Sequence, residues 1–220
     1  NSGDDEFYER SNRVEKFKSA SKVNFIEGFK VFGGTAWSFA HQVFYDQLDY
    51  LFIDEAGQVS LANLVGMSES ADNLILMGDQ MQLSQPTIGT HPDRTGLSSL
   101  DYLLEERPTI PDNIGILLPK TYRLHPDICK FVSQKVYEGR ITAIDDNKKR
   151  IIKPCSNSKY LKPSGIQYIE LDHWGNEQAS FEEVEIIKSI ILELLDSKKE
   201  GYGENTISEK DILIISPYNH

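Results

Sequence analysis

Cysteine is scarce in this sequence, which has only Cys129 and Cys155 and no Cys-x-x-Cys pair. Two isolated thiols exclude a disulfide framework and a zinc site built on paired cysteines. They suit the reducing cytoplasm, where we expect the protein to act. Long apolar runs are absent as well, and the polar, acidic beginning does not have the form of a signal peptide. We therefore expect no membrane partner.

Positive charge is also in short supply, because 23 Lys and Arg residues stand against 34 Asp and Glu residues and give a formal net charge of −11. Proteins that bind nucleic acid mainly by neutralising its phosphates are usually basic, so charge alone disfavours this partner. Net charge does not describe one local groove, however, and the partner stays open. The 220 residues, 39% of them hydrophobic, are enough for one good-sized domain or two small ones.

Short apolar runs alternate with helical stripes along the chain, which predicts an α/β protein with parallel sheets. The run at 50–53 lacks alternation, as is typical of a strand buried on both faces. Residues 145–163 are polar and predict a loop or a small insertion. The expected strands are 29–32, 50–53, 73–77, 114–118, 165–171 and 212–215. The expected helices are 36–48, 59–66, 97–106, 125–137 and 181–195.

A break in this pattern at Pro119 marks the best domain boundary. It divides the chain into an N-terminal helical segment at 1–28, a first domain at 29–118 and a second at 119–220. The sequence stops directly after the last expected strand, before a helix that would cover it. We therefore expect an excised fragment.

Two carboxylates follow the strand expected at 50–53, within residues 51–58 (LFIDEAGQ). Asp54 and Glu55 are thereby placed at the carboxyl end of a buried strand, where α/β sheets bind ligands. In P-loop NTPases such an aspartate holds Mg²⁺, and a neighbouring acid positions or activates the attacking water. The competing interpretation is that both acids cap the following helix, since acids favour helix N-termini.

A second buried strand ends in polar residues, within residues 74–83 (LILMGDQMQL). Gly78 lets the backbone turn close to a ligand, and Asp79 follows it directly. Gln82 can donate and accept hydrogen bonds, so it can contact a phosphate oxygen and a water together. An ordinary turn with a polar exit is the alternative, which the short spacing to the first motif weakens.

A third motif occupies residues 120–126 (KTYRLHP), just before a helix start. Tyr122 can stack on a base, and the guanidinium of Arg123 can reach a phosphate. Alternatively, Arg123 pairs with a surface acid and Tyr122 packs at the edge of the domain.

In this order the three motifs resemble those of superfamily 1 helicases of the Upf-like group, which carry DEA-x-Q, GD-x-x-QL and YR-x-HP followed by Y-x-G. The counterparts here are residues 54–58, 78–83, 122–126 and 137–139. The resemblance implies an α/β fold with parts of two RecA-like, parallel-sheet domains of the P-loop NTPase type, truncated at both ends. It also implies Mg²⁺-dependent ATP hydrolysis coupled to movement on single-stranded nucleic acid, with DNA favoured over RNA. Residues near 58–62 and 83–86 are most similar to bacterial proteins that join a RecB-like nuclease to such a helicase.

The resemblance assigns roles at the first two motifs. Asp54 would bind Mg²⁺ through water, and Glu55 would be the base for the hydrolytic water. Gln82 would sense the γ-phosphate of ATP, and Asp79 would support its loop.

It assigns further roles elsewhere in the chain. Arg123 would stabilise the γ-phosphate and Tyr122 would stack on adenine. Glu183 stands where the family often has an acid near the ribose, although exposed helices are rich in glutamate anyway. Thr35 matches a threonine that contacts the nucleic-acid backbone, and a plain strand-end turn competes with this interpretation.

Three departures from the family pattern matter. Gly57 stands where Ala or Ser is usual, and residues 84–86 replace the more usual Pro-Pro. Neither touches the catalytic side chains, but each can alter the coupling between the sites. No Gly-Lys-Ser/Thr occurs, so the loop that holds the phosphates is missing. We therefore expect the chain to be inactive by itself and its parent protein to be the ATPase.

Three other functions stay open. One is a P-loop ATPase that acts as a switch without unwinding. Another is a metal-dependent nuclease or phosphohydrolase in which Asp54, Glu55 and Asp79 are direct ligands, although this leaves Gln82 and Arg123 without a role. The third is a binding or scaffold domain with no chemistry.

Overall fold

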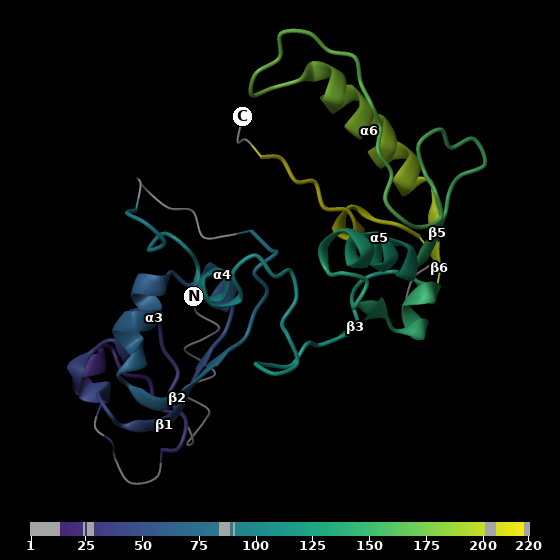
Figure 1. Ribbon diagram of the computed structural model, residues 1–220. Coiled ribbons are helices and arrows are strands. Elements are labelled where there is room, and N and C mark those ends of the chain that lie inside the picture. Colours follow the sequence, from purple (N-terminus) through teal and green to yellow (C-terminus); the bar gives the residue numbers. More distant parts are fainter. Residues whose placement is uncertain are drawn as a thin grey trace. The chain divides into compact units, whose positions relative to one another are not determined.

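The computed structural model describes residues 14–23, 25, 29–83, 89, 91–200 and 206–217. The chain divides into two compact units, Asn1–Pro108 and Thr109–His220 (Figure 1). The predicted boundary at Pro119, with its segments 1–28, 29–118 and 119–220, stays a prediction. Most of the predicted N-terminal helical segment lies outside the described residues, and the part within them contains one short 3₁₀ turn.

The first unit contains short helices and a pair of strands. Its helices are α2 (Ala36–Phe39), α3 (Leu61–Ser68) and α4 (Ser99–Leu104), its strands are β1 (Leu48–Ile53) and β2 (Ala71–Leu76), and its 3₁₀ turns are η1 (Ala20–Lys22), η2 (Gln42–Phe44) and η3 (Ala56–Gln58).

β1 and β2 form a parallel pair in which Ile53 lies opposite Leu76. The ladder continues past the strand ends, because the Met77 N–H donates to the Ile53 carbonyl over 2.8 Å. Helix α3 connects the two strands along the chain. The strands predicted at 50–53 and 73–77 are thus confirmed, and so is an α/β class with parallel pairing.

Burial along β1 alternates. Leu51 and Ile53 are 4% and 5% exposed, whereas Tyr50 and Phe52 are 57% and 60% exposed. The prediction that this strand is buried on both faces was wrong for the described chain. Its buried residues pack with helix residues into a single cluster, so the outward face of the strand has no covering layer among the described residues.

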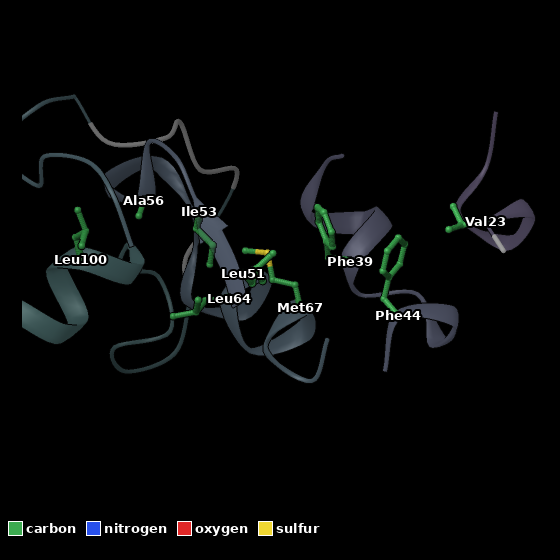
Figure 2. Packing of buried hydrophobic residues seen from close by; sticks show 9 residues of the cluster. All are labelled: Val23, Phe39, Phe44, Leu51, Ile53, Ala56, Leu64, Met67 and Leu100. Atoms are coloured by element: carbon green, nitrogen blue, oxygen red, sulfur yellow. The ribbon is translucent and has the colours of Figure 1, made fainter. Parts of the chain in front are cut away.

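One hydrophobic cluster forms the core of this unit. The Phe44 ring contributes contacts to Phe39 and Phe32, with ring centroids 5.1 Å and 5.9 Å apart, the second edge to face. Such tilted and edge-on geometries are favoured between aromatic rings. The buried members are Val23, Phe39, Phe44, Leu51, Ile53, Ala56, Leu64, Met67 and Leu100 (Figure 2).

The helix predicted at 36–48 is broken into two pieces. The imidazole Nδ1 of His41 accepts a hydrogen bond from the Val43 N–H at 3.2 Å, which starts a new 3₁₀ turn. Asp46 then takes a left-handed φ of 53° and leads the chain into β1. The hydrogen bond from the Val43 N–H to the His41 side chain therefore interrupts the helix that the sequence pattern predicts.

Helix α4 is fixed at its start by serines. The Ser98 hydroxyl accepts from the Asp101 N–H at 3.1 Å and donates to its carboxylate at 2.7 Å. The N–H of Ser99 donates to the Val59 carbonyl over 2.7 Å. The helix predicted at 97–106 is confirmed with shorter bounds, and its start is bonded to the segment that follows the first motif.

The second unit contains two longer helices and short strands. Its helices are α5 (Pro126–Val136) and α6 (Phe181–Leu195), its strands are β3 (Lys120–Thr121), β4 (Thr142–Ala143), β5 (Ile151–Lys153) and β6 (Lys198–Glu200), and its 3₁₀ turns are η4 (Asp145–Lys149) and η5 (Glu209–Asp211). β3 and β4 are parallel, and β5 and β6 are antiparallel.

Helix α5 has clear signals at both ends. The His125 imidazole accepts from the Asp127 N–H at 3.2 Å, with proline at the first turn. At the other end the Gly139 N–H donates to the Ser133 carbonyl over 2.8 Å, and Gly139 has a φ of 75°. The Tyr-x-Gly segment is therefore the C-terminal cap of this helix. The helix predicted at 125–137 is confirmed.

Helix α6 matches its prediction at both ends, because its apolar stripe is long and Ser180 caps it.

The polar stretch 145–163, predicted as a loop or insertion, contains η4 and β5. Pairing with β6, which lies far along the chain, creates β5, and a local pattern does not reveal such a partner.

Among the residues described, no helix has both the length and the apolar character that a membrane span needs.

Four predicted strands are not formed in the described chain, namely 29–32, 114–118, 165–171 and 212–215. A strand requires a neighbour for its backbone hydrogen bonds, and none of these four pairs into a sheet within the described ranges. Several of their apolar side chains consequently stay exposed, at 87% for both Val31 and Ile116. Apolar composition makes a segment suitable for a sheet but does not supply the adjacent strand.

Acid is expected to loosen the end of the second unit. The Ser208 amide, followed by the Lys199 ammonium and the Ser208 hydroxyl, lowers the pKa of Asp211 from 3.8 to about 2. A lowered pKa stabilises the folded state above pH 3.8, and this contribution disappears as the pH falls to about 2. Urea midpoints measured across this range should depend less on pH in Asp211→Asn than in the unchanged chain. Identical pH dependence in the two would contradict the assignment.

Candidate active site at the strand ends

Asp54 and Glu55 leave the sheet in a sharp turn directly after β1. The Asp54 carboxylate accepts a hydrogen bond from the Glu55 N–H at 3.0 Å, and both side chains are exposed. Glu55 has φ 51° and ψ 41°, a left-handed conformation that costs energy for any residue but glycine. Such strained residues cluster at functional sites.

The helix-cap interpretation of these acids does not fit the turn. Glu55 occupies the N-cap position of η3, but its carboxylate makes no capping hydrogen bond there. The Asp54 carboxylate is bonded to the N–H of its own neighbour rather than to η3. The Glu55 carboxylate is therefore exposed at the strand end without a capping role.

Asp79 orients Gln82 in the turn after β2. One oxygen of the Asp79 carboxylate accepts from the Met81 N–H at 3.0 Å, and the other accepts from the Gln82 side-chain amide at 3.1 Å. Because the amide nitrogen of Gln82 faces Asp79, its oxygen remains available to accept a hydrogen bond. The turn is also anchored by Gln80, whose side-chain amide donates to the Arg107 carbonyl at 2.8 Å.

The two turns interlock through their backbones. A Cβ on Gly57 would lie 2.4 Å from the Asp79 carbonyl oxygen, and a Cβ on Gly78 would lie 2.8 Å from the Ala56 nitrogen. Gly78 also has a φ of 151°, and the Ala56 N–H donates to the Met77 carbonyl over 2.8 Å. The structure thus brings the first two motifs together at one edge of the sheet. Gly57, which differs from the family pattern, lies at the point of closest approach.

Tyr122 and Arg123 project from the turn after β3 in the second unit. Tyr122 is 69% exposed, and the Arg123 guanidinium has no hydrogen-bond or ion-pair partner among the described residues. The Thr121 hydroxyl accepts from the Arg123 N–H at 3.2 Å, so it is the backbone that is fixed. Neither pairing of Arg123 with a surface acid nor burial of Tyr122 is therefore seen.

Thr35 and Glu183 lie at the starts of helices rather than in these turns. Thr35 is the N-cap of α2, and its hydroxyl lies 3.3 Å from that of Ser38. Glu183 lies in the first turn of α6, where its N–H donates to the Ser180 hydroxyl at 3.2 Å. Neither side chain forms a hydrogen bond with another candidate residue in the described part of the chain. Residues 84–86 lie outside that part.

Asn147 and Arg150 are neighbours of the third motif that the sequence pattern did not reveal. Both contact its backbone from the stretch predicted as a loop. A buried asparagine within a run of charged residues gives no pattern that would identify it.

Direct metal ligation by protein alone needs several side chains that converge on one point. Within the described ranges, no three His, Cys, Asp or Glu residues converge to hold a metal. Mg²⁺ usually takes one or two carboxylates and fills its remaining positions with water and phosphate oxygens. The exposed Asp54 carboxylate fits binding of this kind, in which water and phosphate oxygens supply most of the ligands.

Parallel strands that end in acidic turns are the arrangement of RecA-like domains in P-loop NTPases. Two family models, each described as an AAA domain, match residues 2–90 and 97–220. The chain belongs to this AAA-domain family of superfamily 1 helicases of the Upf1-like group.

Curated relatives are consistent with this family. Helicase sen1 of Schizosaccharomyces pombe is 31% identical over 157 residues, which cover 66% of this chain and 9% of that protein. The DNA replication ATP-dependent helicase/nuclease dna2 of the same yeast is 28% identical over 162 residues, covering 72% and 11%. The DNA polymerase alpha-associated DNA helicase A of Schizosaccharomyces pombe is 25% identical over 217 residues, which cover 93% of this chain and 31% of that protein. The chain spans less than a third of each of these relatives.

Proposed function

We propose that this chain supplies the water-activating and γ-phosphate-sensing parts of the ATPase site in a superfamily 1 helicase or translocase. The observation that carries the proposal is the interlock of the turns after β1 and β2. It holds Glu55 and the Asp79–Gln82 pair at the same edge of one sheet. Interlocked turns suit a reaction in which one side chain activates water and another contacts the phosphate that the water attacks.

Each side chain of these turns has a chemical task in the proposal. Glu55 accepts the proton of the attacking water, and its exposure leaves its carboxylate free to do so. The second N–H of the Gln82 side-chain amide donates to a γ-phosphate oxygen and its oxygen accepts from that water, while Asp79 keeps the amide in this orientation. Asp54 holds Mg²⁺ through water. Bound Mg²⁺ offsets negative charge on the β- and γ-phosphates.

The second unit contributes nucleotide contacts in the same proposal. The Tyr122 ring stacks on adenine, and the guanidinium of Arg123 stabilises charge on the γ-phosphate. Glu183 accepts from the ribose. Thr35, in the first unit, contacts the backbone of the single-stranded nucleic acid.

In the proposal, DNA is favoured over RNA as the nucleic acid along which the protein moves, and a nuclease domain is linked to the helicase. The relative dna2 is named as both a helicase and a nuclease, which supports the linked nuclease. A switch that hydrolyses ATP without unwinding is the second candidate, and the net charge of −11 favours it.

A strand-displacement assay on the full-length protein tests the proposal. With ATP and Mg²⁺ the protein should hydrolyse ATP faster when single-stranded DNA is added, and it should release the strand of a tailed duplex. Hydrolysis without strand release would favour the switch, and no hydrolysis would contradict both. A parallel set with RNA tails identifies the track.

This chain alone is the matched control in the same assay. It contains no Gly-Lys-Ser/Thr to hold the phosphates, so it should release no phosphate above the buffer rate. Steady turnover by the chain that disappears in Glu55→Gln would show that the missing loop is not required.

A further inference from the structure

Within the described part of the chain, the orientation of the exposed Tyr122 and Arg123 side chains is set by the backbone that carries them. The Arg123 guanidinium has no hydrogen-bond or ion-pair partner among the described residues, and Tyr122 is 69% exposed. A catalytic group that is not held by its own contacts depends on the segment beneath it for alignment. The question is therefore what fixes the turn between β3 and α5.

Asn147 brackets that turn. It is fully buried, and its side-chain amide donates to the Leu124 carbonyl at 2.9 Å and to the Thr121 carbonyl at 3.3 Å. One bond thus precedes the Tyr122–Arg123 pair and the other follows it. The Thr121 carbonyl also accepts from the Ile144 N–H at 3.2 Å, so the approach of η4 to this turn rests on side-chain and backbone bonds together.

Arg150 adds a third bond to the same turn. Its guanidinium donates to the carbonyl of Arg123 itself over 2.8 Å. Asn147 lies within η4 and Arg150 is its C-cap residue, and the Arg150 N–H donates to the Asn147 carbonyl at 3.1 Å. The carbonyls before, within and after the motif are therefore all held by one short segment.

Asn147 is retained at a cost. Its side-chain oxygen is buried and has no hydrogen-bond partner among the described residues. A buried polar atom without a partner is unfavourable, so a residue chosen only to fill space here would be apolar. The two amide bonds to the turn are the feature that an apolar residue of similar size would lose.

We propose that Asn147 and Arg150 are positioning residues for ATP hydrolysis, acting through the backbone of Tyr122 and Arg123. The inference rests on the nucleotide contacts proposed above for those two side chains. Asn147 and Arg150 are then a clamp that aligns the guanidinium with the γ-phosphate and the ring with the base.

Double-mutant cycles in the full-length protein test the clamp. Arg150→Met removes the bond to the Arg123 carbonyl at an exposed position and should lower kcat/KM for ATP roughly 3- to 10-fold, the worth of one hydrogen bond. Asn147→Ala removes two bonds and should lower it about 10- to 100-fold, as misplaced catalytic groups do. Neither change should have a further effect when Arg123 and Tyr122 are already alanine, because the clamp then has nothing to align.

Two further variants separate alignment from folding. Arg150→Lys keeps a donor and should restore much of the activity that Arg150→Met loses. Lys148→Met removes an exposed cation from the same 3₁₀ turn, where it pairs with Asp145 at 2.7 Å, and should leave kcat/KM unchanged. Equal losses in the original and in the alanine background would show that the clamp supports only the fold, and the inference would be wrong.

The outcomes also distinguish this inference from the function on which it rests. If Arg123→Ala slows turnover while Arg150→Met and Asn147→Ala do not, the clamp is refuted and the role of Arg123 stands. If Arg123→Ala leaves turnover unchanged, the proposed role of Arg123 fails and the clamp fails with it.

Discussion

Replacing Glu55 by Gln in the full-length protein is expected to slow ATP hydrolysis by about 10²–10⁴-fold, the usual contribution of a general base. The amide has nearly the same shape as the carboxylate but cannot take a proton from water. Nucleotide binding should largely survive, because the phosphates and the base are contacted by other groups. Steady-state phosphate release gives the rate, and a fluorescent ATP analogue gives the affinity.

Glu105→Gln is a matched control for this change. Glu105 is also an exposed glutamate with a positive φ, at 57°, and it ends α4 in the same unit. The same chemical change there should leave turnover unaltered. If Glu55→Gln and Glu105→Gln hydrolyse ATP at equal rates, Glu55 is not the base.

Replacing Gly78 by Ala is expected to destabilise the chain by about 2–4 kcal/mol, from an unfavourable positive φ together with overpacking. The new Cβ would lie 2.8 Å from the Ala56 nitrogen and 3.2 Å from that of Gly57. Both neighbours are backbone atoms, which cannot swing aside as the end of a side chain can. Urea unfolding followed by circular dichroism measures the loss.

Gly66→Ala provides the control for an added methyl group. Gly66 lies within α3, where a Cβ would meet only the Ala40 methyl at an ordinary 3.7 Å. Alanine favours the helix, so this variant should be more stable by about 0.5–1 kcal/mol. A Gly78→Ala chain as stable as the original would mean that the turns do not approach each other as described.

Elements whose signals are local could be predicted from the sequence. α6 has an uninterrupted apolar stripe with a serine cap, and α5 has proline at its start and glycine beyond its end. The strands at 114–118 and 212–215 failed for a different reason. Their sequences suit a sheet, but pairing depends on a neighbour that the described chain does not contain.

The candidate residues were found from motif order, whereas their geometry was not. Nothing in the letters around Glu55 predicts its left-handed backbone, which arises where β1 meets η3. The contact of Gly57 with the Asp79 carbonyl joins segments that a helix and a strand separate in the sequence. The contacts of Asn147 and Arg150 with the third motif could not be predicted either, because a single buried asparagine produces no periodic pattern in the sequence.

The interlocked turns behave as a mechanical linkage. The backbone of Asp79 lies against Gly57 with no side chain between them, and a hydrogen bond joins Ala56 to Met77 at their base. The loop that carries Gln82 therefore cannot advance toward η3 without displacing the turn that carries Glu55. If Gln82 contacts the γ-phosphate, as proposed, a displacement of its side-chain amide also displaces the carboxylate of Glu55. Loss of the phosphate then shifts both turns together.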